Sequence, residues 1–147
     1  MAEAAAITSQ ETGLTVASHT GDGAAALEQI EIFKRRGAPA ARFVWVHAQS
    51  EKSHELHAQA AKGGAWVEFD GINEKSADWH RECVEFMAGA GLLGRTLISQ
   101  DSGWYRVGEP QGGNYRGYTY IYTGFLPALK PEWVTVLMRD NPLKAFG

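Results

Sequence analysis

The chain has 147 residues, of which 14 are basic and 17 are acidic, and its formal net charge is −3. This length fits one domain with a sizeable core, and the well-mixed charges without a basic stripe argue against a nucleic-acid partner. No apolar run reaches the roughly 18 residues of a membrane-spanning helix, which argues against a membrane partner.

The N-terminus lacks the basic start and the long apolar stretch of a signal peptide. Cys83 is the single cysteine, so an internal disulfide is excluded. Both observations agree with a reducing compartment, and we expect a cytoplasmic protein.

Short apolar runs alternate with longer amphipathic runs up to residue 101. Helices are predicted over residues 2–11, 22–36, 53–62 and 76–90. Strands are predicted between them, over residues 14–18, 42–46, 65–69 and 95–99. Asp22 is expected to cap the helix that follows it. Strands that alternate with helices of this length indicate an α/β fold with a parallel sheet and right-handed crossovers.

The regular alternation stops after the fourth strand. Residues 103–117 form a predicted loop with five glycines and one proline, and loops of this length are usually functional or disordered. Closing helices are predicted over 118–129 and 131–138, and a last turn over 141–146 has Asn141 as its cap and Pro142 at its first position. One domain is therefore expected, with a leading helix (1–12), four strands with helices (13–101), and a glycine-rich and aromatic loop with closing helices (102–147).

A histidine or an aspartate follows each predicted strand: His19, His47, Asp70 and Asp101. Ligands of parallel α/β proteins bind at the carboxyl ends of the strands, and imidazole with carboxylate suits zinc and similar ions. The pattern therefore predicts His19, His47 and Asp101 as metal ligands. Asp70 either belongs to the same site or caps a turn through its own backbone.

Other histidines lie away from the strand ends. His54 and His57 are three residues apart on one predicted helix, and we interpret them as part of a solvated helix face because no strand end points at them. His80 is interpreted as a surface or interhelical residue.

The glycines of the loop do not match a phosphate-binding pattern, because no GxGxxG or GK[ST] opens a helix there. The loop is interpreted as a flexible lid. Its aromatic residues Trp104, Tyr105 and Tyr115 either line a pocket or pack the loop onto its own scaffold.

Five motifs occur in a fixed order along the chain: SHTG (18–21), VHAQSE (46–51), EFDGI (68–72), ISQDSGW (98–104) and NPLKAF (141–146). Together they resemble the second half of the phosphotriesterase-like branch of the amidohydrolase superfamily. The resemblance extends from about residue 11 to the end of the chain.

The resemblance implies a (β/α)8 barrel with two metal ions, usually zinc, at the carboxyl ends of its strands. By this match His19 follows strand five and His47 follows strand six, and both bind the more exposed metal. Asp101 follows strand eight, binds the more buried metal, and acts as the catalytic residue that handles the proton of the bridging hydroxide. Two metals lower the pKa of the bridging water and polarise the P=O or C=O bond of the substrate.

The implied reaction is the hydrolysis of phosphotriesters, lactones or related small-molecule esters. On this interpretation Asp70 belongs to the substrate pocket. The loop aromatics Trp104, Tyr105 and Tyr115 would shape the part of that pocket that holds the leaving group or the acyl group.

The sequence departs from the family pattern in two respects. It has no His-x-His motif, no lysine or glutamate ends a strand ahead of His19, and 147 residues are fewer than the roughly 200 of a complete barrel. We therefore expect strands five to eight only, with the remaining ligands supplied by a segment upstream of Met1 or by another chain. The turn after His47 also lacks the acidic residues of many relatives, and Glu51 is the candidate substitute for a proton-relay acid there.

Two functions follow as alternatives. The chain is part of a binuclear metal hydrolase, or it is a catalytically incomplete half barrel that binds one metal or none and self-associates through its open strand edges. A non-catalytic binding module is disfavoured, because all three predicted ligands are present.

Overall fold

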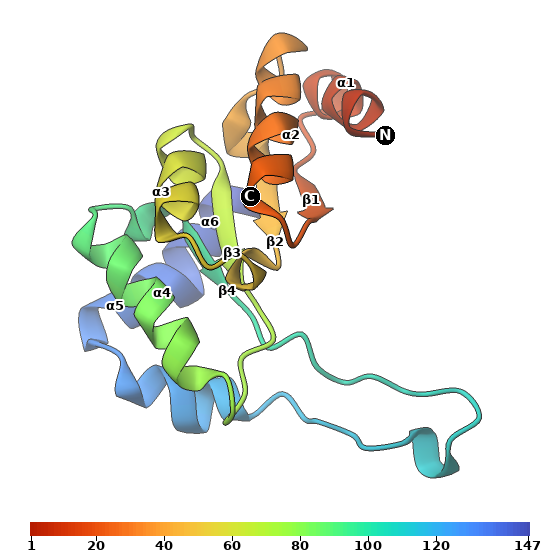
Figure 1. The fold of residues 1–147 in the computed structure, drawn as a ribbon, viewed down its shortest axis with the longest axis vertical. Helices are drawn as coiled ribbons and strands as arrows, with labels where there is room; N and C mark the ends of the chain where they lie inside the picture. Colours follow the sequence, from red (N-terminus) through yellow and green to blue (C-terminus); the bar gives the residue numbers. More distant parts are fainter.

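The computed structural model describes residues 1–147 and contains one sheet of four parallel strands in the order β1-β2-β3-β4 (Figure 1). Each strand is separated from the next by a helix, and a further helix precedes the first strand. The α/β architecture predicted from the sequence is therefore confirmed. In chain order the elements are α1 (Ala2–Thr12), β1 (Val16–His19), α2 (Gly23–Arg35), β2 (Phe43–Val46), α3 (His54–Lys62), β3 (Trp66–Phe69), α4 (Ala77–Gly89) and β4 (Thr96–Ile98).

The expected capping of α2 is also present. The backbone amide of Ala25 donates to Oδ1 of Asp22 at 2.9 Å, in the first turn of the helix. This bond satisfies an amide that has no partner within the helix.

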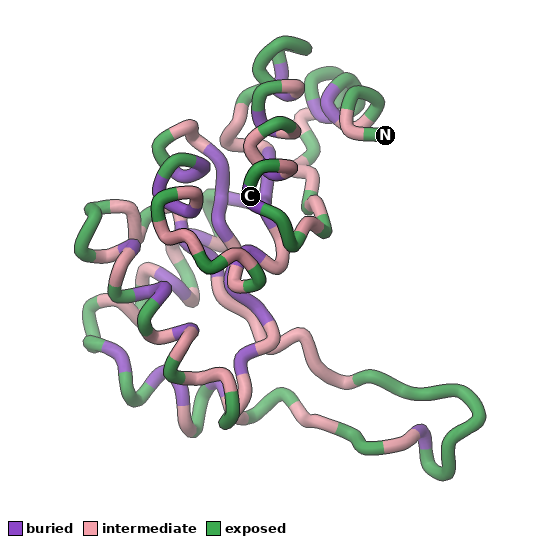
Figure 2. The backbone as a smooth tube through the Cα atoms, in the orientation of Figure 1, coloured by how far each residue is buried: buried purple, intermediate pink, exposed green.

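The two faces of the sheet carry different side chains, because successive residues of a strand point to opposite sides. Phe43 and Trp45 of β2 join the large core cluster, to which α2, α3 and α4 contribute. Val44 lies between them in sequence and joins a small cluster with Trp66 and Leu97 on the other face. Figure 2 shows buried residues, in purple, along the strands and at intervals along the helices.

The C-terminal helix α6 (Asn141–Phe146) covers part of that second face. Ala145 belongs to the same small cluster, and its carbonyl oxygen accepts a hydrogen bond of 2.6 Å from the Thr15 hydroxyl. Thr15 precedes β1 and Trp66 begins β3, so α6 lies at the amino ends of the strands. The carboxyl ends of the strands carry polar side chains instead.

The closing helices differ from the prediction because two prolines interrupt α-helical hydrogen bonding. Regular α-helix was expected over 118–129, but residues Ile121–Phe125 form a π-turn and Leu126–Ala128 a 3₁₀ turn. The amide before each proline donates five residues back, from Leu126 to Ile121 and from Asn141 to Val136. A proline nitrogen has no hydrogen to donate, and each wide turn comes immediately before one.

The second π-turn, Val136–Asp140, joins α5 (Pro131–Thr135) directly to α6. The predicted cap at Asn141 is therefore wrong, because this residue is helical and fully buried. Its Nδ2 donates to the carbonyl oxygens of Leu93 at 2.8 Å and Thr96 at 2.6 Å. Asn141 thus ties the C-terminal helices to the start of β4.

The prediction that His54 and His57 lie on a solvated helix face is also wrong. His57 is 0% exposed, and the half-buried His54 ring stacks on Trp79 and Phe86 of α4. These side chains fill the space between α3 and α4, which sequence spacing alone does not indicate. His80, expected at the surface or between helices, is buried, and its Nε2 lies 2.6 Å from the Asp70 carbonyl oxygen.

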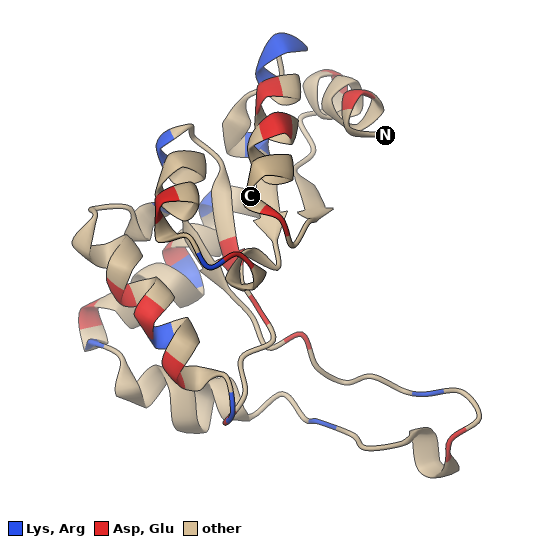
Figure 3. Cartoon of the chain, in the orientation of Figure 1, with Lys and Arg blue, Asp and Glu red and all other residues tan.

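The segment after β4 is irregular up to about residue 120, as the loop prediction required. It extends away from the helices in Figure 1 and is mostly exposed in Figure 2. Acidic and basic residues are interspersed along the helices in Figure 3. No helix is both long and apolar enough to cross a membrane.

Replacing Asn141 by alanine removes the donors that serve two carbonyl groups near the start of β4. We expect the free energy of unfolding to fall by about 2 kcal/mol, since buried polar groups left without partners cost about 1–3 kcal/mol. Urea denaturation measures this difference. Asn114→Ala, in the exposed part of the loop, is the matched control and should leave the midpoint unchanged; equal midpoints for both variants would contradict the assignment.

Candidate metal centre

His47 is held by Asp70, which follows the neighbouring strand. The His47 amide donates to Asp70 Oδ2 at 2.9 Å, and His47 Nδ1 lies 2.6 Å from Asp70 Oδ1. A carboxylate only accepts hydrogen bonds, so the hydrogen of the ring is placed on Nδ1 and the lone pair of Nε2 remains free. A histidine that binds metal commonly donates its other ring nitrogen to a carboxylate in this way.

Asp70 is itself fixed on several sides. Gln49 donates to Asp70 Oδ1 at 2.8 Å and accepts from the Asp70 amide at 3.0 Å. Asp70 is only 2% exposed, and both of its carboxylate oxygens are used by protein donors. The geometry therefore favours a role in orienting His47 over direct contact with a substrate.

The backbone is strained at two of the three strand ends that carry predicted metal ligands. His47 has φ 64° and Asp101 has φ 39°, in the left-handed region that residues other than glycine seldom occupy. Such conformations cost on the order of 1–3 kcal/mol each and cluster at functional sites. Hydrogen bonds to neighbouring groups hold both residues in place.

Arg116 holds the turn at Asp101. Its Nη2 donates to the carbonyl oxygens of Gln100 at 2.9 Å and Asp101 at 2.6 Å, and its Nη1 to those of Gly71 and Ile72 at 3.3 Å. One guanidinium thus joins the turns after β3 and β4. Sequence reasoning missed this residue because nothing marks a loop arginine as a ligand of carbonyl groups.

The structure brings the predicted ligands together to different degrees. His47, Asp70 and Asp101 each offer a ligand atom within 4.8 Å of the others. His19 lies outside that group, but its ring is perpendicular to that of His47 with centroids 4.0 Å apart. His19 is exposed on the first strand, whereas Asp101 is half-buried. The donor set of two imidazoles and a carboxylate suits zinc.

Glu68 lies on β3 near the same site. Burial raises the pKa of its carboxyl group, and the nearby Asp70 carboxylate raises it further. Sequence reasoning did not single out this residue, because a glutamate inside a strand looks like an ordinary outward-facing polar position. A carboxyl group with a raised pKa beside candidate ligands is typical of a functional region.

Glu51 does not act as an acid near His47 in this structure. Its carboxylate accepts from the amides of Ser53 at 2.8 Å, Lys52 at 2.7 Å and Gly23 at 3.2 Å. The Ser53 amide is the main reason that its pKa is lowered. The glutamate therefore caps the starts of α2 and α3 rather than substituting for a relay acid.

The loop aromatics do not form a pocket with the strand ends. Trp104 is 63% exposed, Tyr105 74% and Tyr115 65%. None of them lines a cavity in the structure. A cavity of about 480 Å³ does reach His19, but it lies between α1 and β1, with Val16 and Phe43 among its lining residues.

The sequence profile described as "Phosphotriesterase family" matches residues 1–146. The phosphotriesterase homology protein of Escherichia coli (strain K12) is 29% identical over 151 residues, which cover 97% of this chain and 51% of that protein. The chain therefore spans about half the length of this relative.

Solved structures show the same relation. A lactonase from Listeria monocytogenes superposes with a TM-score of 0.85 at 27% identity, over 99% of this chain and 48% of the lactonase. The Escherichia coli phosphotriesterase homology protein, with phosphate in its active site, gives 0.82 at 25% identity, over 99% and 52% of the two chains. The four strands and their helices thus correspond to part of a larger barrel.

Arg116→Lys should loosen the turns after β3 and β4, because an ammonium group cannot reproduce the four guanidinium contacts. We expect faster hydrogen exchange at the amides of Ile72 and Gly103, which bond to Ser99 and Arg116 across these turns. Mass spectrometry of the exchanged peptides measures the change. Arg106→Lys is the control, because the exposed Arg106 pairs only with Glu109; the same exchange in both variants would show that Arg116 does not hold the turns.

The raised pKa of Glu68 predicts a pH-dependent cost to stability. The folded state binds this proton more tightly than the unfolded state, so stability is lost as pH rises from the ordinary glutamate pKa through the raised value. Glu68→Gln removes this loss, so the free energy of unfolding of the variant should rise relative to that of wild type over the pH range that begins at the ordinary glutamate pKa of about 4.3. Urea denaturation across that range tests this, with the exposed Glu11→Gln as control. A difference that does not change with pH would refute it.

Proposed function

Because the chain belongs to the phosphotriesterase family, we propose that it provides part of the active site of a metal-dependent hydrolase of lactones, phosphotriesters or related esters. The proposed metal ligands are His19, His47 and Asp101, and the proposed metal is zinc. The match over residues 1–146 and the likeness to a lactonase support this reaction class.

One observation carries the proposal more than the others. The Asp70 carboxylate accepts a hydrogen bond of 2.6 Å from Nδ1 of His47, which leaves the lone pair of Nε2 free on a ring that lies close to the carboxylate of Asp101. A histidine with no ligand to bind does not require such tight control of its tautomer. The arrangement therefore fits a metal ligand better than a structural histidine.

When bound, two zinc ions would lower the pKa of water and polarise the carbonyl or phosphoryl group of the ester. The residues of the chain have separate tasks. His47 presents Nε2, Asp70 keeps the ring in this orientation, and the Asp101 carboxylate accepts the proton of the attacking water. Arg116 keeps Asp101 in place through the backbone.

Trp104, Tyr105 and Tyr115 remain the proposed pocket residues, and Asp70 now has an orienting role in place of its predicted pocket role. The loop would have to fold back over the strand ends for its aromatics to touch a substrate. A glycine-rich loop with few contacts to the body of the protein can make such a movement.

The remaining ligands are proposed to come from another segment or another copy of the chain. The chain spans 51% of the Escherichia coli relative, and β1 and β4 each have a free edge. Free edges of parallel strands favour pairing with further strands. An incomplete half barrel that binds one metal is the second candidate, and it is favoured by the absence of a His-x-His motif.

Zinc titration of the chelator-treated chain distinguishes these functions. Asp101→Asn and His47→Asn should each weaken zinc binding at the strand ends by at least about tenfold, because each removes a ligand. Isothermal calorimetry gives affinity and stoichiometry. Hydrolysis of a lactone and of an aryl phosphotriester is then measured on the zinc-loaded protein.

Asp22→Asn is the control, since Asp22 caps α2 and is expected to leave zinc affinity unchanged. A zinc stoichiometry and affinity that are both unchanged in the His47→Asn, Asp101→Asn double variant would refute the proposed site. One zinc ion at the strand ends without hydrolysis would favour the incomplete half barrel. Hydrolysis of either ester that depends on Asp101 would favour the enzyme.

A further inference from the structure

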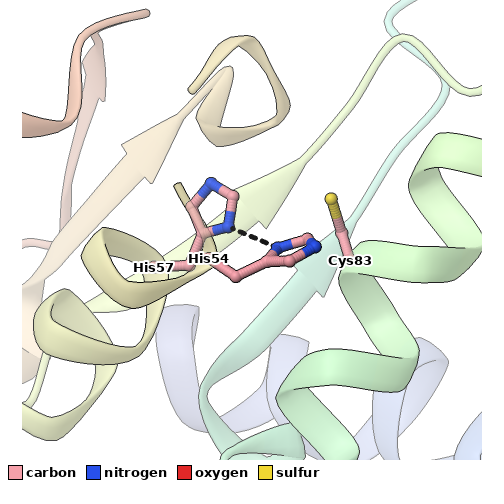
Figure 4. A group of neighbouring side chains, drawn as sticks. All are labelled: His54, His57 and Cys83. Carbon is pink, nitrogen blue, oxygen red and sulfur yellow. Dashed lines mark hydrogen bonds between the residues drawn. The ribbon is translucent and has the colours of Figure 1, made fainter. Parts of the chain in front are cut away.

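A second group of metal-ligating side chains lies between α3 and α4, apart from the strand ends. His54 and His57 come from α3, and Cys83 comes from α4 (Figure 4). Each offers a ligand atom within 4.8 Å of the other two. His57 and Cys83 are completely buried and His54 is half-buried, so the group is closed to bulk water on most sides.

The outer hydrogen bonds of the two histidines determine where their protons lie. His57 Nε2 is 2.8 Å from the carbonyl oxygen of Ala48, and His54 Nε2 is 3.2 Å from Oε1 of Glu82. Both oxygens are acceptors, so in neutral rings both Nε2 atoms carry the hydrogen. The two Nδ1 atoms then have only lone pairs.

These two lone-pair atoms face one another. The Nδ1 atoms of His54 and His57 are 3.5 Å apart, along the dashed line of Figure 4. Two lone pairs at this distance repel unless a positive charge lies between them. A tetrahedral zinc ion with bonds of about 2.05 Å holds its nitrogen ligands about 3.4 Å apart, which is close to the observed separation.

The outer contacts also match those of metal-binding histidines. Such residues usually donate the second ring nitrogen to a carbonyl or a carboxylate, which fixes the ring and raises its basicity. His57 has the carbonyl of Ala48 and His54 has the carboxylate of Glu82. Ring stacking of His54 on Trp79 and Phe86 holds its plane in place.

We propose that His54, His57 and Cys83 form a second metal site, which binds zinc or a similar soft divalent cation and joins α3 to α4. The site is independent of the proposed hydrolase centre, because it shares no ligand with it. Its three protein ligands leave a fourth position for water. A cation here would brace the 3₁₀ turn Ala48–Ser50, which follows His47, because the Ala48 carbonyl accepts from His57.

The protonation states agree with a site that takes up a metal ion by releasing a proton. Burial lowers the pKa of His57, which favours the neutral ring that binds metals. Burial raises the pKa of the Cys83 thiol to about 12, so the sulfur is protonated until a cation displaces the proton. On metal binding, the Cys83 thiol loses its proton to solvent and the sulfur forms a bond to the metal ion.

Cobalt(II) is the probe for this site, because a thiolate bound to cobalt gives a charge-transfer band in the near ultraviolet and imidazole or carboxylate ligands do not. The full chain is titrated with Co²⁺ after treatment with a chelator. The band should appear in wild type and in the His47→Asn, Asp101→Asn double variant. It should be absent in Cys83→Ser, and the apparent Co²⁺ affinity at this site should fall at least about tenfold in His54→Gln.

Circular dichroism checks that each variant is folded. His54→Gln is the variant expected to disturb folding least, because His54 is the most exposed of the three ligands. No band in folded wild type would overturn the proposal and assign the positive charge between the rings to a proton. An apparent Co²⁺ affinity in His54→Gln equal to that of wild type would also overturn the proposal. Since the double variant lacks the strand-end ligands, failure here is separate from failure of the proposed hydrolase site.

Discussion

The buried carboxylate of Asp70 fixes both the backbone and the ring of His47 across two neighbouring strands. This contact exists only because β2 and β3 are parallel and adjacent, which brings their carboxyl ends to the same edge. A buried charge is costly without partners. Two donors from His47 and one from Gln49 offset that cost, so the positioning of the histidine and the burial of the aspartate depend on each other.

The second face of the sheet is divided along the strands. Its amino end is apolar and packed under α6, through Val44, Trp66, Leu97 and Ala145. The carboxyl end carries the histidines and carboxylates. The apolar end supplies rigidity through close packing, and the polar end contains strained backbone at His47 and Asp101. Strain at the site is tolerated because the rest of the sheet is held firmly.

The strands, the helices and the edge of the sheet that carries the site could be predicted from the sequence. Features that depend on tertiary contacts could not. The period of apolar residues revealed the strands and helices, and the polar residues after each strand revealed the edge where His47, Asp70 and Asp101 meet. The same reasoning failed at His54 and His57, because helical spacing does not say which neighbouring helix covers a face. It failed at Arg116 as well, since its partners are carbonyl groups that any residue possesses. It failed at Asn141, where a familiar Asn-Pro cap is instead a buried donor inside a helix.

The two π-turns before prolines have a consequence for how this segment tolerates insertions and deletions. A π-turn contains one residue more than the α-helical turn that it replaces. The extra residue is taken up within the turn, so the helix beyond Val136–Asp140 keeps nearly the rotation that an uninterrupted α-helix one residue shorter would give it. Asn141 thereby reaches the carbonyls of Leu93 and Thr96, and Ala145 packs on the sheet. We therefore expect loss of one residue from this turn to preserve these contacts, whereas gain of one residue would rotate Asn141 and Ala145 away from them by about 100°.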